Sequence, residues 1–300
     1  MENHFKSGFI ALIGRPNVGK STLMNALVGQ KVAIMSPKPQ TTRNRIQSIL
    51  TTENKQIIFV DTPGIHKPKS KLGEYMNTAA FFTFKEVDLI FWLIEPSDNI
   101  GAGDQLIIEK LKEAKTPVIL IINKMDTVEK SHLLKVIDAY KDVYPFLEII
   151  PISALKQQNT DRLLELVDAH LEEGPQFFPE DMITDQPEKQ IVSELIREKV
   201  LRLLQDEIPH GVAVVIESMD DTEDNSQVII EATIVCEKKS HKPIILGKNG
   251  SMIKQIGILS RKDIEAFLLA HVRLNLWVKV KENWRDSEYL MKNYGYRKGE

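Results

Sequence analysis

Cysteine is almost absent from this sequence of 300 residues, since Cys236 is its single example. One thiol cannot form an intramolecular disulfide or a metal site built from several cysteines, which excludes disulfide-stapled and multi-cysteine metal proteins. Cys236 follows the apolar stretch 228–235, so we interpret it as a small buried side chain. Long apolar runs are also missing: the longest, 89–94 and 118–122, are much shorter than the roughly 20 residues that a membrane-spanning helix needs.

The N-terminal residues, MENHFKSGF, lack the basic start and following apolar stretch of a secretory leader. Together with the single thiol, this predicts a protein that works in the reducing environment of the cytoplasm.

Net charge is small, because 39 basic and 42 acidic residues give −3. That average argues against a protein that binds nucleic acid through its bulk charge. The charges are unevenly distributed, however. Residues 238–300 contain 14 Lys or Arg and 6 Asp or Glu, a balance of +8, which leaves −11 for residues 1–237. The sequence therefore predicts a basic C-terminal segment within an acidic chain.

The first 175 residues alternate short apolar runs with amphipathic stretches. Apolar runs without alternation are typical of strands that are buried on both faces, and amphipathic helices between them predict a doubly wound, mostly parallel α/β sheet. We expect strands at 8–13, 56–60, 89–94, 118–122 and 147–151, and helices at 20–27, 104–114, 132–143 and 160–171.

The pattern changes after residues 176–189, a polar stretch that we interpret as a linker. The order α-β-β-α-α-β follows, in a smaller α+β domain. We therefore expect one domain over 1–175 and a second over 190–300. The elements expected in the second are a helix at 191–204, strands at 211–219 and 227–236, helical segments at 242–258 and 261–271, and a strand at 272–280.

GRPNVGKS at 14–21 fits the phosphate-loop pattern and lies between an expected strand and an expected helix. Backbone N–H groups at the start of that helix attract a polyphosphate, and glycines allow close approach. We expect Lys20 to reach the β and γ phosphates and Ser21 to coordinate Mg²⁺. The predicted GTP-binding residues here are Asn17, Val18, Gly19, Lys20, Ser21 and Thr22.

Three further motifs follow predicted strands. Asp61 of DTPG emerges from a strand end, where it would hold Mg²⁺ through water, while the N–H of Gly64 faces the γ-phosphate. Asp126 of NKMD can accept from N1–H and the 2-amino group of guanine, whereas adenine offers no such pair of donors. Ser153-Ala154 follows another expected strand and would place a backbone N–H beside the guanine O6. Together the motifs predict a guanine-nucleotide site that includes Asp61, Gly64, Asn123, Lys124, Asp126, Ser153 and Ala154.

PQTTR at 39–43 lies in a proline-flanked loop between the phosphate loop and DTPG. A switch needs a hydroxyl that binds Mg²⁺ only when the γ-phosphate is present, and we assign it to Thr42, with Thr41 as the alternative. Ile65 stands where Ras-like enzymes carry a water-orienting glutamine, which predicts slow intrinsic hydrolysis of GTP. The expected catalytic residues are Lys20, Thr42 and Gly64, and the expected Mg²⁺ ligands are Ser21, Thr42 and Asp61.

GKNG at 247–250 joins two expected helical segments within the basic end of the chain. A GxxG loop can be a simple helix-helix turn, but in KH domains it clamps nucleotide backbones, and the order α-β-β-α-α-β is that of the type II KH fold. We therefore expect single-stranded RNA to bind at Lys242, Gly247, Lys248, Asn249, Gly250 and Lys254.

The combination of GRPNVGKS, PQTTR, DTPG, NKMD and SAL with a KH-like GKNG resembles the Era family of bacterial GTPases over nearly the whole chain. The resemblance implies binding to the 3′ region of 16S rRNA, a role in assembly of the small ribosomal subunit and peripheral association with the inner membrane. Asn17 resembles the asparagine that helps some such GTPases to hold K⁺; the alternative is that it only shapes the loop. The alternative function is a membrane-associated regulatory GTPase whose KH fold docks protein or lipid.

Overall fold

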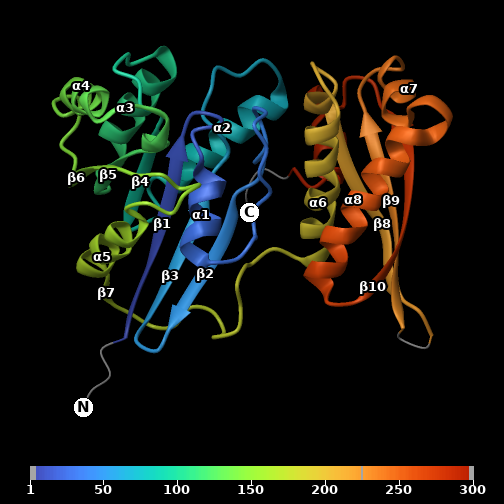
Figure 1. Ribbon diagram of the computed structural model, residues 1–300, viewed down its shortest axis with the longest axis horizontal. Coiled ribbons are helices and arrows are strands. Elements are labelled where there is room, and N and C mark those ends of the chain that lie inside the picture. Colours follow the sequence, from blue (N-terminus) through green and yellow to red (C-terminus); the bar gives the residue numbers. More distant parts are fainter. Residues whose placement is uncertain (1–4, 224–225, 297–300) are drawn as a thin grey trace. The chain divides into compact units, whose positions relative to one another are not determined.

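The computed structural model describes residues 5–223 and 226–296 and divides into two compact units (Figure 1). The first comprises Met1–Ala33, Thr42–Lys69 and Gly73–Asp185, and the second Ile34–Thr41, Ser70–Leu72 and Gln186–Glu300. Residues 1–4 and 297–300, which our expected domain ranges include, lie outside the described residues. Within the described ranges, no helix has the length and apolar character needed to cross a membrane.

The first unit is built on a seven-stranded sheet with the order β2-β3-β1-β4-β5-β6, to which β7 adds a short pairing with β1. The inner strands pair in parallel, which confirms the expected doubly wound, mostly parallel sheet. The strands are β1 (Lys6–Gly14), β2 (Ile46–Thr52), β3 (Lys55–Asp61), β4 (Leu89–Ile94), β5 (Val118–Ile122), β6 (Glu148–Pro151) and β7 (Glu172–Glu173).

Helices cover both faces of this sheet. One face packs against α1 (Lys20–Val28) and α5 (Thr160–His170), as Leu23 and Leu163 share a core with Phe59. The other packs against α2 (Lys71–Thr83), α3 (Ala102–Ala114) and α4 (Lys130–Tyr140). Because parallel strands between two helical layers end at the same edge, the loops after β1, β3, β5 and β6 gather there.

Three elements of the first unit were not expected from the sequence: strand β2, helix α2 and the short strand β7. Strand β2 pairs antiparallel with β3 at the edge of the sheet, and its polar residues Gln47, Ser48 and Thr51 interrupt the apolar run that would mark a buried strand. Helix α2 contains Gly73, a residue that weakens helices, although Met76 and Ala80 are buried four positions apart on one side of it. Residues 177–184 run along β2 and β3. The side-chain amide of Gln56 forms hydrogen bonds with the backbone of Phe178, and Thr184 forms an antiparallel β-bridge with Ser48.

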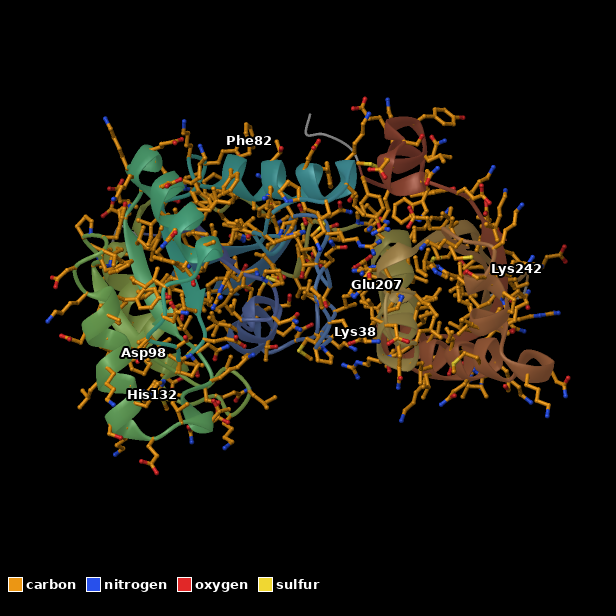
Figure 2. All side chains as sticks on the ribbon, turned by 90° about the horizontal axis from the view of Figure 1, so that it is seen from above. Lys38, Phe82, Asp98, His132, Glu207 and Lys242 are labelled. Atoms are coloured by element: carbon orange, nitrogen blue, oxygen red, sulfur yellow. The ribbon has the colours of Figure 1, made fainter. Side chains whose placement is uncertain are left out.

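The second unit places helices on one face of a three-stranded sheet, in the order β10-β9-β8. Its elements follow the expected order α-β-β-α-α-β, although one continuous helix, α8, replaces the break that we expected near residue 260. They are α6 (Glu188–Leu203), β8 (Val212–Asp221), β9 (Gln227–Cys236), α7 (His241–Leu246), α8 (Ser251–Leu268) and β10 (His271–Val280). A further helix that was not expected, α9 (Glu288–Asn293), follows β10. Side chains fill the space between helices and sheet within each unit (Figure 2).

Helix α6 holds the short segment Ile34–Thr41, which belongs to the same unit. Arg197, only 1% exposed, donates to the carbonyl oxygens of Gln40 at 3.4 Å and of Thr41. The carboxylate of Glu198 accepts from the backbone N–H of Met35 at 3.2 Å. These bonds satisfy backbone groups of the segment with two neighbouring charged side chains of one helix, which fixes the segment on α6.

The aromatic residues after β10 pack on the second unit. Trp284 is fully buried and donates from Nε1 to the carbonyl oxygen of Gly211 at 2.9 Å, and its ring stacks against Tyr296. Tyr289, by contrast, is 74% exposed. Trp284 therefore anchors the C-terminal segment to the body of its unit.

We expect Trp284→Ala to lower the free energy of unfolding of the second unit by about 3–5 kcal/mol, because it removes a large buried side chain and orphans the Gly211 carbonyl. Urea denaturation followed by circular dichroism measures this change. Tyr289→Ala is the matched control, with an expected change below about 0.5 kcal/mol. Equal effects of the two substitutions would contradict the anchoring role of Trp284.

Candidate nucleotide site and nucleic-acid interface

The phosphate loop lies between β1 and α1 and wraps around the ammonium group of Lys20. Lys20 Nζ donates to the carbonyl oxygens of Gly14 at 3.2 Å and Arg15 at 3.0 Å, and the residue is only 6% exposed. Burial lowers the pKa of Lys20 to about 8, against the opposing charge of Asp61. Gly14 and Gly19 have positive φ values, which L side chains rarely adopt, so the loop can turn tightly around this cation.

Two hydroxyl groups and one carboxylate meet beside the loop. Ser21 Oγ donates to Asp61 Oδ2 at 2.5 Å and lies 2.9 Å from Thr42 Oγ1, which in turn lies 3.2 Å from Asp61 Oδ2. Burial raises the pKa of Asp61, while the charge of Lys20 and the bonds from both hydroxyls oppose that shift. Among the described residues, Asp61 Oδ1 is buried without a hydrogen-bond partner. Oxygen atoms of this kind are the ligands that Mg²⁺ prefers.

The two threonines of PQTTR point to different partners. Thr42 joins Ser21 and Asp61, as described above, whereas Thr41 Oγ1 donates to the carbonyl oxygen of Lys38 at 2.6 Å. The structure thus brings Thr42, and not Thr41, to the candidate metal ligands.

Gly64 of DTPG lies tightly against the phosphate loop. A Cβ atom at Gly64 would stand 2.7 Å from both the backbone N and the Cα of Pro16. The next residue, Ile65, donates its N–H to the carbonyl oxygen of Gly14 at 3.1 Å and is fully buried in the apolar core. Its side chain therefore faces the protein interior and cannot position a water molecule.

Asn123 connects three of the sequence motifs. Its Nδ2 donates to the carbonyl oxygen of Val18 in the phosphate loop at 2.8 Å, and its Oδ1 accepts from the N–H of Ala154 at 3.0 Å. A Cβ atom at Gly19 would stand 2.2 Å from Asn123 Nδ2, so this close approach also requires glycine.

Asp126 lies beside that junction, in the loop after β5. A hydrogen bond from the Ser153 hydroxyl is the main cause that lowers the pKa of Asp126, and Lys156 Nζ lies 3.2 Å from Asp126 Oδ2. Lys124 pairs instead with Glu95. Of the remaining expected residues in this unit, Asn17 is exposed with φ 66° and Thr22 lies in the first turn of α1.

The GKNG loop connects α7 to α8 in the second unit. Gly247 has φ +72°, and a Cβ atom there would stand 2.7 Å from the backbone N of Met252. Gly250 has φ +77°, with no atom within 4 Å of the corresponding position. Lys248 and Asn249 between them are exposed, so the loop presents its backbone and one ammonium group to the surroundings.

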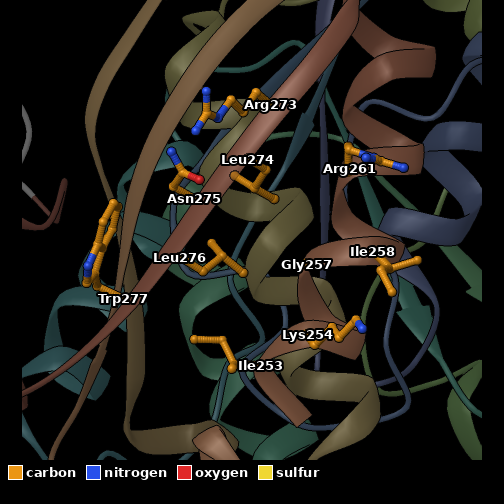
Figure 3. Close-up of a pocket in the computed structure, with 10 residues that line it drawn as sticks. All are labelled: Ile253, Lys254, Gly257, Ile258, Arg261, Arg273, Leu274, Asn275, Leu276 and Trp277. Carbon is orange, nitrogen blue, oxygen red and sulfur yellow. The ribbon is translucent and has the colours of Figure 1, made fainter. Parts of the chain in front are cut away.

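A groove of about 510 Å³ lies between α8 and β10, next to this loop (Figure 3). Leu274 and Leu276 point from the strand toward Gly257 on the helix, while Trp277, 52% exposed, lies on the other side of the strand. The groove combines an apolar floor with cationic groups along its rim, which suits bases and phosphates respectively. Its lining residues are Ile253, Lys254, Gly257, Ile258, Arg261, Arg273, Leu274, Asn275, Leu276 and Trp277.

Of the six residues that we expected to bind RNA, Lys254 lines the groove and four form the GKNG loop. Lys242, labelled in Figure 2, is exposed on α7. The contribution of β10 to this groove was not expected from the sequence, although the alternation of polar and apolar residues along that strand could have indicated one open face.

Residues 9–124 match the family described as 50S ribosome-binding GTPase, and residues 207–285 match the KH domain family. The chain is 57% identical to GTPase Era of Clostridioides difficile over 293 residues, and this aligned region covers 97% of this chain and 99% of the relative. It is 55% identical to GTPase Era of Clostridium botulinum, over 98% of this chain and 99% of that protein.

Two crystal structures of Era are similar throughout. One, in complex with MgGDPNP and nucleotides 1506–1542 of 16S ribosomal RNA, is 40% identical with a TM-score of 0.94, covering 98% of this chain and 99% of that one. The other, a single-residue variant of Aquifex aeolicus Era bound to GDP·AlF4−, is 39% identical with a TM-score of 0.93, covering 97% and 99%.

The fold, the motifs and these matches define a P-loop GTPase that carries a KH domain. More closely, the chain belongs to the Era family of GTPases.

We expect Gly64→Ala to slow single-turnover GTP hydrolysis by at least about tenfold, because the new Cβ must displace either DTPG or the backbone of Pro16. Rapid-quench measurement of phosphate release tests this. Gly257→Ala is the control, since its Cβ would meet Leu276 at an ordinary 3.5 Å and the hydrolysis rate should not change. Normal hydrolysis by the Gly64 variant would show that this close approach is dispensable.

Proposed function

We propose that this GTPase is a nucleotide-controlled switch that binds single-stranded 16S rRNA near its 3′ end and acts in assembly of the small ribosomal subunit. One observation carries the nucleotide half: Asn123 ties the phosphate loop to the strand end that bears Ala154, within reach of Asp126. That junction joins a phosphate-binding backbone and a guanine-selective carboxylate in one rigid frame. We propose that the GTPase domain spans 1–175, the linker 176–189 and the KH domain 190–300.

The oxygen cluster beside the loop fits Mg²⁺. Ser21 and Thr42 would hold the ion directly and Asp61 would hold it through water, and the bound ion supplies charge that neutralises the β and γ phosphates. In this assignment Thr42 binds only while the γ-phosphate is present, Lys20 contacts the β and γ phosphates, and the N–H of Gly64 donates to the γ-phosphate.

Hydrolysis is expected to be slow without an activator. The buried side chain of Ile65 cannot orient water, so the attacking water must be positioned by another group. Asn17 is exposed at the outer turn of the loop, which fits a role in holding K⁺ beside the phosphates.

The second unit supports RNA binding through the open GKNG loop and the cationic groove between α8 and β10. The relative bound to nucleotides 1506–1542 of 16S ribosomal RNA favours the same class of ligand here. We propose that the protein works in the cytoplasm and associates peripherally with the inner face of the cell membrane. The competing proposal is a membrane-associated regulatory GTPase in which the KH fold docks protein or lipid.

Nucleotide and RNA binding would be coupled through the segment that ends at Thr41. The carbonyl of Thr41 accepts from Arg197 of α6, and the next residue is Thr42, which joins the candidate metal ligands. Ordering Thr42 around GTP and Mg²⁺ therefore acts on a segment that is anchored to the first helix of the KH unit, and we propose that this alters access of RNA to that unit.

We expect Gly250→Asp to weaken binding of an oligonucleotide of 16S rRNA nucleotides 1506–1542 by at least about tenfold, through repulsion from phosphate. Space around Gly250 is open and the left-handed backbone tolerates Asp and Asn, so both variants should fold. Gly250→Asn, which has the same shape without charge, is the matched control for fluorescence-anisotropy titration, and GTP binding should not change in either variant. Unaltered RNA binding by Gly250→Asp would favour the docking alternative.

We expect Asp126→Asn to lower GTP affinity at least about a hundredfold and to raise affinity for xanthosine triphosphate. Asparagine can donate to the carbonyl that replaces the 2-amino group in xanthine but cannot pair with both guanine donors. Calorimetric titration with both nucleotides tests this, and unchanged preference for GTP would remove Asp126 from the base site.

We expect GTP turnover to be several-fold faster in KCl than in NaCl at equal ionic strength, and Asn17→Ala to abolish that difference. Steady-state phosphate release measures both. Equal rates of the unmodified protein in the two salts would rule out the K⁺ role and leave Asn17 as a residue that only shapes the loop.

A further inference from the structure

A buried ion pair connects the phosphate loop to the first turn of α3. Arg15 Nε lies 3.2 Å from Asp104 Oδ1, and the side chain of Asp104 is fully buried while that of Arg15 is 31% exposed. Arg15 lies within the phosphate-loop motif GRPNVGKS, whereas Asp104 belongs to none of the motifs that define the nucleotide site, and 89 positions separate the two residues in the sequence.

The surroundings of this pair are shaped to hold it. A Cβ atom at Gly103 would stand only 3.0 Å from Arg15 Cδ, so the stem of the arginine lies closely over the start of α3. Burial raises the pKa of Asp104, and the guanidinium of Arg15 is the main charge that opposes this. The hydroxyl of Tyr140, from α4, also faces the carboxyl group and helps to hold that pKa down.

Stability alone gives a weak reason for such a pair. Burying two charges costs nearly as much as their attraction returns, and apolar side chains of similar volume are often equally stable. Besides Arg15, the backbone N–H of Gly101 and the hydroxyl of Tyr140 face the Asp104 carboxyl group, so three elements of the first unit hold this carboxylate in place. A role in fixing geometry explains the pair better.

The backbone of Arg15 shows what is fixed. Its carbonyl oxygen accepts from Lys20 Nζ at 3.0 Å, and the carbonyl of Gly14 accepts from the same ammonium. On the opposite side of the loop, Val18 is buried in the core that packs on α1. The loop therefore has an apolar anchor at Val18 and an ionic anchor at Arg15, on either side of exposed Asn17.

We propose that Asp104 is a positioning residue for GTP: through the Arg15 side chain it sets the Arg15 carbonyl, and through that carbonyl it sets the ammonium of Lys20 for the phosphates. This inference rests on the proposed phosphate contact of Lys20. Loss of the pair leaves the motifs intact but allows the Lys20 ammonium to move away from its place in the loop.

The test is a double-mutant cycle with Asp104→Asn and Lys20→Met, read by titration with a fluorescent, non-hydrolysable GTP analogue. Asp104→Asn should weaken binding about tenfold in the unmodified protein and less than about twofold in the Lys20→Met background, because its effect acts through Lys20. Glu109→Gln, which changes an exposed carboxylate on the same helix, should leave affinity unchanged.

Each outcome separates the two levels of the account. Unchanged affinity in Lys20→Met alone would remove Lys20 from the phosphate site and with it the proposed site. Lys20→Met weakens affinity for the analogue if the phosphate contact is real. The positioning role alone would then be overturned if Asp104→Asn left the affinity unchanged, or if it lowered the affinity equally in the unmodified protein and in the Lys20→Met background. If Asp104→Asn unfolds, the amide pair Arg15→Gln with Asp104→Asn replaces it in the same cycle, with the same criteria.

Discussion

The desolvated ammonium of Lys20 is the constraint around which the first unit is organised. A lysine that is 6% exposed must exchange water for protein oxygen atoms, and the carbonyls of Gly14 and Arg15 supply them. To bring these carbonyl oxygens to the ammonium group, the loop turns tightly, with Gly14 and Gly19 at positive φ. It also places a cation opposite Asp61, where hydroxyls from α1 and from the PQTTR loop complete a set of oxygen ligands.

The rigid parts of this site come from the edge of the parallel sheet. Loops that leave β1, β3, β5 and β6 meet there, and Asn123 locks three of them with two hydrogen bonds. Close backbone approaches at Gly19 and Gly64 leave no room for a side chain. Positioned backbone and a few charged groups are sufficient for phosphoryl transfer, because that chemistry depends mainly on orientation and electrostatic stabilisation.

The sequence predicted the features that depend on local pattern. Buried apolar runs located β4 and β5 at their observed ends, and the GxxG loop was correctly placed between two helices. It missed edge strand β2, where pairs of polar residues interrupt the apolar run, and it broke α8 near residue 260, where Ser260 is buried within a continuous helix. The Arg15–Asp104 pair could not be predicted, because only the tertiary fold brings the two side chains together. The average charge of −3 likewise concealed the basic groove, whose cations lie on two elements of the second unit.

The central claim is that nucleotide binding and RNA binding are thermodynamically coupled through the segment that ends at Thr41. The most direct measurement is the affinity for 16S rRNA nucleotides 1506–1542 with a GTP analogue and with GDP bound, alongside the reciprocal effect of RNA on the two nucleotides. The account predicts that the affinities differ by at least about fivefold and that the reciprocal ratio is the same, as linkage requires. Identical RNA affinities in the two nucleotide states would contradict it and leave two independent modules on one chain.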